Sequence, residues 1–145
     1  MNDLIETLLE QPCWVIDLLP ARVPAEGAGR FFPVEEWYLG APRAGDLRRR
    51  VADVLLKLGC YHDLTVVRDG DDAGVRNPAP ADLVAWVMAD QGTVNVVVDD
   101  GAALVALQSQ VTGMALYGPS PELLDLVRAL AGASGLFVWD ASTGS

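Results

Sequence analysis

The sequence predicts a single α+β domain, in which amphipathic helices pack on a mainly antiparallel sheet. Three segments rich in β-branched and apolar residues, 93–98, 103–108 and 111–117, follow one another closely along the chain. An Asp-Gly dipeptide at 100–101 is a strong signal for a hairpin, whose two strands run antiparallel. Residues 46–58 carry apolar side chains at helical spacing, which predicts a helix with one buried face.

Length and composition fit one domain with a core of its own. The chain has 145 residues, of which 51% are hydrophobic, so it can bury a core without disulfides or metal ions. We assign the domain to residues 1–140 and residues 141–145 to a polar C-terminal tail.

One segment in the first part of the chain is ambiguous. Pro33 and Gly40 could bracket a short helix, but the aromatic content of 31–39 favours a strand that pairs back with the strand before it. The elements expected before the 46–58 helix are, in order, a helix at 3–10, a buried strand at 13–19, an irregular loop at 20–30 and a strand at 31–39.

The helix at 46–58 offers an explanation for the run of three arginines at 48–50. Arg49, Asp53 and Lys57 follow one another at intervals of four with alternating charge, which supports a solvated polar face. We assign the arginine run to that face. Gly59 follows the last apolar residue and is placed to end the helix in a left-handed C-cap.

In the second half of the chain, Ser120 suits an N-cap and Pro121 the first position of a helix. The elements expected around the three central strands are a strand at 64–69, an acidic loop at 70–80, a helix at 81–90, a helix at 121–131 and a strand at 135–139. The segments 37–59 and 115–135 share an order of strand, tyrosine, Gly-Pro turn signals, helix and glycine. This similarity between the two segments would fit two β-β-α-β units, although two copies are too few to establish a repeat.

Charge and hydropathy argue against several function classes. A net charge of -10 repels phosphate backbones, so we expect no binding to nucleic acid. No apolar run reaches the ~18 to 20 residues that span a bilayer, so no membrane insertion is expected. The N-terminal stretch carries acids where a signal peptide has basic residues. We therefore expect a cytoplasmic protein whose cysteines, Cys13 and Cys60, are reduced.

The stretch "GCYHD", residues 59–63, contains the chain's one histidine and one of its two cysteines. On a strand, Cys60 and His62 would share a face and Asp63 would point the other way. Such a pair could be a thiolate–imidazole couple or part of a zinc site, but zinc requires three or four ligands. We favour a buried Cys60 and an exposed His62 without chemistry, and we expect no catalytic residue, metal ion or cofactor.

Aromatic and arginine side chains gather around the 20–30 loop, which is long for a connection between neighbouring strands. Partner-binding surfaces are enriched in aromatic residues and arginine. The candidate ligand- or partner-binding residues are Trp14, Arg22, Arg30, Phe32, Trp37 and Tyr38.

Two long stretches carry a resemblance to a known group of proteins: "CWVIDLLPARVPAEGAGRFFPVEEWYL" (13–39) and "LYGPSPELLDLVRALAGASGLFVW" (116–139). They resemble the two ends of a family of small bacterial proteins of similar length, whose function is uncharacterised. The resemblance covers most of the chain and implies a bacterial, cytoplasmic source. It implies no activity, cofactor or site.

Two functional hypotheses follow from the sequence. The first is a non-enzymatic interaction or regulatory protein that binds a protein partner; a homo-oligomer is compatible with it. The second is a protein or enzyme that binds a small anionic molecule in a pocket lined by Trp14, Trp37 and Tyr38 and gated by Arg22 or Arg30. The two hypotheses differ in what they predict for Arg22 and Arg30: the second requires side chains that converge on a cavity, and the first allows them to point to solvent.

Overall fold

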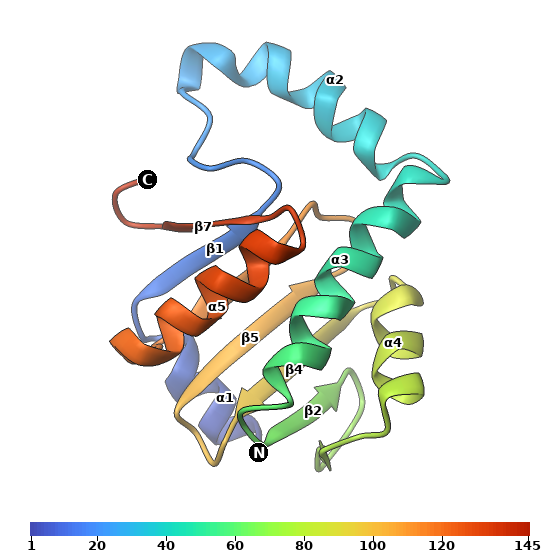
Figure 1. The fold of residues 1–145 in the computed structure, drawn as a ribbon, viewed down its shortest axis with the longest axis vertical. Coiled ribbons are helices and arrows are strands. Elements are labelled where there is room, and N and C mark those ends of the chain that lie inside the picture. Colours follow the sequence, from blue (N-terminus) through green and yellow to red (C-terminus); the bar gives the residue numbers. More distant parts are fainter.

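A seven-stranded antiparallel sheet forms the centre of the protein in the computed structural model, which describes residues 1–145 except for the side chain of Ala28. The strands lie in the order β3-β2-β4-β5-β6-β1-β7, so β1 is inserted between the last two strands of the chain (Figure 1). The strands are β1 Cys13–Asp17, β2 Leu64–Arg68, β3 Val75–Arg76, β4 Thr93–Val98, β5 Ala103–Gln108, β6 Met114–Tyr117 and β7 Phe137–Asp140.

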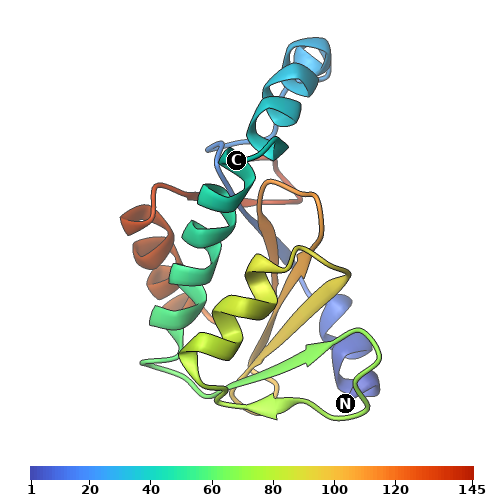
Figure 2. The ribbon, with the colours of Figure 1, turned by 90° about the vertical axis from the view of Figure 1, so that its right-hand side faces the viewer.

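Helices cover the two faces of the sheet unequally (Figures 1 and 2). Three helices, α3, α4 and α5, pack on one face and form the larger core with its strands. On the other face, α1 packs Ile5 and Leu8 against Val67, Val97 and Leu104, which come from β2, β4 and β5. The helical elements are α1 Asn2–Leu9, a short 3-10 helix η1 Ala25–Gly27, α2 Ala28–Leu39, α3 Arg43–Leu58, α4 Pro80–Met88 and α5 Pro121–Ala133.

The predicted fold class is confirmed: the chain is a single α+β domain built on an antiparallel sheet. The β4–β5 hairpin has the expected strands, and Ser120 caps α5 by accepting a hydrogen bond from the Leu123 amide at 3.1 Å. Within the described residues, none of the helices combines the length and hydropathy needed to cross a bilayer.

The predicted strand at 31–39 is wrong, because this segment belongs to helix α2. β1 pairs with β6 along one edge and with β7 along the other, so it has no free edge left for a strand that follows it. The predicted loop at 20–30 is correspondingly shorter, since η1 begins at Ala25. The first of the two similar segments therefore contains a helix where a strand was expected, and two β-β-α-β units are not present.

The end of α3 also differs from expectation. Gly59 has φ -62° and ψ -15°, which is right-handed, so the prediction of a left-handed cap is wrong. The chain instead continues into a tight turn, in which the amides of Tyr61 and His62 both donate to the Leu58 carbonyl. Strand β2 begins only at Leu64, so residues 60–62 are not part of a strand.

Arg48 is buried, so the prediction that the arginine run lies on a solvated face is wrong for this residue. Its guanidinium donates to the Val87 carbonyl at 3.0 Å and the Gln108 carbonyl at 3.2 Å, and it pairs with Asp90 at 3.1 Å. Burial lowers the pKa of Arg48, and the nearby Asp90 carboxylate opposes that shift. Arg48 thus joins α3 to the end of α4 and to β5.

Candidate functional site

Helix α2 projects from the body of the protein and joins it mainly at its two ends (Figures 1 and 2). Half of its twelve residues are large and apolar, yet none of its described side chains is buried. Most of the stability of a protein helix comes from packing of an apolar face, and an isolated helix of this length is marginal in water. The exposed side of α2 therefore lacks a partner surface within the chain.

The most exposed part of this helix is defined here as the outer face of α2, formed by Arg30, Phe32, Val34 and Trp37. Phe32 is 61% exposed and Trp37 is 54% exposed. Arg30, Val34 and Trp37 follow the i, i+4, i+7 spacing that places side chains in one strip along a helix. Phe32 is two residues from both Arg30 and Val34, so it lies on nearly the opposite side of the helix from that strip. The inner residues of the helix, including Tyr38, are half-buried.

Trp37 is held in place although it is exposed. The Arg43 guanidinium lies 3.9 Å from the centroid of the Trp37 ring, and Arg43 Nε donates to the Trp37 carbonyl at 2.5 Å. Tyr38 meets the indole edge-on, with ring centroids 5.0 Å apart. A ring fixed in this way loses less conformational entropy on binding than a free one, so it is pre-organised for contact with a partner.

The six candidate residues identified from sequence do not meet in one place. Arg30, Phe32, Trp37 and Tyr38 lie on α2. Trp14 lies in β1 on the face covered by α5, where the Arg128 guanidinium is 5.2 Å from its ring centroid. The predicted pocket combining Trp14, Trp37 and Tyr38 is therefore not formed.

Arg22 has a different environment from Arg30. Its amide donates to the Gly144 carbonyl at 2.8 Å, and its Nη2 donates to the Ala141 carbonyl. Its guanidinium also lies 5.5 Å from the centroid of the Trp139 ring. Arg22 thus ties the loop before α2 to the C-terminal turn, and residues 141–145 are held against the domain.

Arg22 also lines a pocket of about 260 Å³ with mainly apolar walls, which include Val23, Phe31 and Trp139. Within the described residues, the buried indole nitrogen of Trp139 has no hydrogen-bond partner. Asp17 lines the same pocket, and burial raises the pKa of its carboxyl despite hydrogen bonds from the Leu18 amide and the Thr112 hydroxyl.

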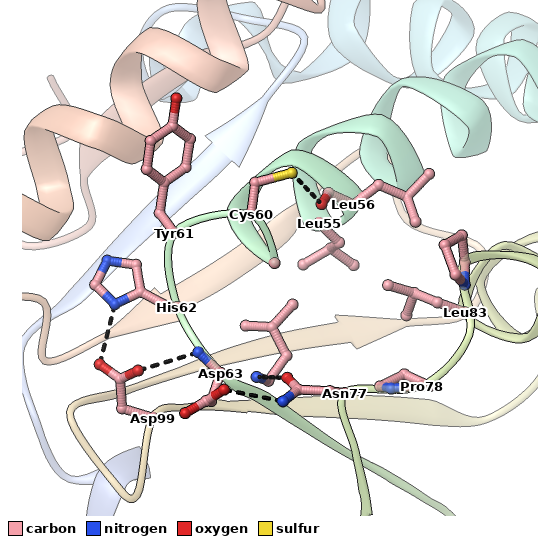
Figure 3. Close-up of a pocket in the computed structure, with 13 residues that line it drawn as sticks. Leu55, Leu56, Cys60, Tyr61, His62, Asp63, Asn77, Pro78, Leu83 and Asp99 are labelled. Atoms are coloured by element: carbon pink, nitrogen blue, oxygen red, sulfur yellow. Dashed lines mark hydrogen bonds and ion pairs between the residues drawn. The ribbon is translucent and has the colours of Figure 1, made fainter.

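The "GCYHD" stretch borders a larger hollow of about 470 Å³, between the end of α3 and the start of α4 (Figure 3). His62 Nδ1 lies 3.0 Å from an Asp99 carboxylate oxygen, and the other oxygen accepts from the Asp63 amide at 3.2 Å. Cys60 points away from His62 and donates to the Leu56 carbonyl at 3.8 Å (Figure 3). The expectation of a shared Cys60–His62 face fails because both residues lie in a turn. Cys60 is also exposed rather than buried.

The charged groups beside this hollow form a structural network. Asp63 accepts hydrogen bonds from the side chains of Arg76 and Asn77, each at 2.9 Å, and Arg76 also bonds Asp100 at 2.8 Å. The Asn77 amide contributes most to lowering the pKa of Asp63, followed by the Arg76 charge. The network ties the turn after α3 to β3 and to the β4–β5 hairpin, which gives each of these groups a structural role.

Sequence reasoning overlooked Arg48, Asp99 and Asn77, because their partners lie 13 to 60 positions away in the chain. Among the described residues, no group of three or more histidine, cysteine, aspartate or glutamate side chains is arranged to hold a metal ion. No protein-family model, curated protein or solved structure matches the chain. Function is therefore inferred from the protein's own surfaces and contacts.

Proposed function

We propose that this chain is a non-enzymatic interaction protein of the bacterial cytoplasm, and that it binds a protein partner through the outer face of α2. One observation carries the proposal: a twelve-residue helix projects from the domain with two aromatic rings more than half exposed and no described side chain buried. Exposed aromatic side chains beside arginine are typical of interaction sites, and these residue types dominate the energetics of such sites.

The charge distribution supports the same surface. Residues 28–43 contain two arginines, Arg30 and Arg43, and two glutamates, Glu35 and Glu36, so this segment is neutral. The net charge of -10 is therefore carried entirely by the rest of the chain. A partner that binds at this segment leaves most of the acidic groups of the chain in water, which avoids the cost of burying them.

Replacing Phe32 and Trp37 together by serine is expected to abolish partner binding and to leave the melting temperature nearly unchanged. Both rings are more than half exposed, and the contacts of Trp37 with Arg43 and Tyr38 lie at the surface, so their loss removes no packing from the core. The measurement compares the proteins retained by wild-type and doubly substituted bait, with thermal melts of both. Lys57→Ser with Glu122→Ser, two exposed sites on α3 and α5, is the matched control. Retention of the same proteins by all three baits would contradict the proposal.

A second candidate function is binding of a small anionic molecule in the pocket beside Arg22. The Arg22 guanidinium is a donor from which a carboxylate could accept, and apart from Asp17 the other walls are mainly apolar. A metabolite that raises the melting temperature of the wild type but not of Arg22→Gln would favour this function over the first.

A further inference from the structure

The face of the sheet that α1 covers also contains an open groove of about 280 Å³. Small side chains form its floor: Ala115 of β6 lies between Val15 of β1 and Ala106 of β5 in the strand pairing. α1 packs against apolar residues from β2, β4 and β5 and not against these three. The groove is lined by Val15, Asp17, Glu35, Ala106, Gln108, Val111, Thr112, Gly113, Met114, Ala115 and Tyr117.

We propose that this groove receives the Arg30–Val34–Trp37 strip of a second copy of the chain, and that the exchange is reciprocal. This inference rests on the proposed function, since it names the partner that the outer face of α2 binds. Each chain carries one helix with an exposed, unpartnered side and one open groove with an apolar floor. In a two-fold dimer the helix of each copy would fill the groove of the other, because each copy presents the same two surfaces to its partner.

Charge complementarity favours a second copy as the occupant. None of the ion pairs within the described residues includes Arg30, which is exposed. The groove holds two carboxylates, Asp17 and Glu35. In the proposed docking, Trp37 and Val34 of one chain cover the apolar floor while Arg30 approaches the carboxylates of the other. Segment 28–43 is neutral, so its approach adds no like-charge repulsion to that between two chains of net charge -10.

The contact area that this docking would bury indicates how stable the dimer is. Two half-exposed tryptophans with their neighbouring valines would bury on the order of 400 Å². With the facing walls the total is about 800 Å², below the usual ~1,200 Å² of a stable interface. The dimer should therefore dissociate on dilution.

Sedimentation of the purified chain tests the inference. The mass is expected to rise with concentration from one chain of 15.4 kDa towards two. Trp37→Ala and Ala115→Arg should each raise the dimer dissociation constant about tenfold or more, one by removing the helix anchor and the other by filling the groove. Gln108→Arg, at an exposed wall residue, replaces Ala115→Arg if that variant fails to fold. Lys57→Ala, at an exposed site on α3 outside both surfaces, is the matched control and should leave the dimer intact.

Mixing the two variants gives the decisive result. Trp37→Ala keeps an intact groove and Ala115→Arg keeps an intact helix, so a mixed pair retains one of the two contacts. Heterodimers in the mixture that exceed the homodimers of either variant support helix-in-groove docking. No rescue on mixing, or a chain that stays monomeric throughout the micromolar range, overturns the inference. In the monomeric case the proposed function still stands if the Phe32/Trp37 double variant loses a different protein that the wild type retains.

Discussion

Replacing Arg48 by alanine is expected to destabilise the protein by about 3 kcal/mol, the lower end for removing one member of a buried ion pair. The substitution removes the guanidinium donor from the Val87 and Gln108 carbonyls and the cation from Asp90, while the Val87 carbonyl keeps the Asp90 amide at 3.4 Å. Asp90 is one-third exposed, so water can recover part of its interaction, and this places the loss at the lower end.

Urea unfolding of Arg48→Ala and Arg49→Ala provides the matched comparison. Arg49 is adjacent in sequence but exposed, so its removal should cost less than about 0.5 kcal/mol. Similar losses for the two arginines would show that Arg48 does not join α3 to α4 and β5.

The second large effect is expected at Leu55, which is fully buried in the larger core. Leu55→Ala should destabilise by about 2 to 5 kcal/mol, because it removes buried methyl groups and leaves a cavity under α3. Leu56 is the matched control: it is the same residue type one position along the helix, but only partly buried. A loss from Leu56→Ala as large as that from Leu55→Ala in urea melts would mean that the faces of α3 are misassigned.

Local signals in the sequence predict the parts of the fold that depend on neighbours in the chain. Asp-Gly at 100–101 marks the β4–β5 hairpin, and Ser120 with Pro121 marks the start of α5; both are confirmed. Residues 31–39 could not be assigned in this way. Their structure depends on β6 and β7, which occupy both edges of β1 and come from the far end of the chain.

The candidate site could be predicted only in part for the same reason. Composition singled out the aromatic residues that lie on α2, but it grouped them with Trp14 and Arg22, which contact α5 and the C-terminal turn. The open groove has no sequence signal, since its floor is made by single residues from β1, β5 and β6. Likewise, the His62–Asp99 contact joins residues 37 positions apart.

Site-specific photo-crosslinking tests most directly the central claim that the outer face of α2 contacts another protein. A photoreactive amino acid replaces Val34, which is 45% exposed on that face, and in a control chain it replaces Lys57, which is exposed on α3. After irradiation in cells, the account predicts a covalent adduct of defined mass from position 34 and none from position 57. No adduct from position 34, or adducts of equal yield from both positions, would contradict it.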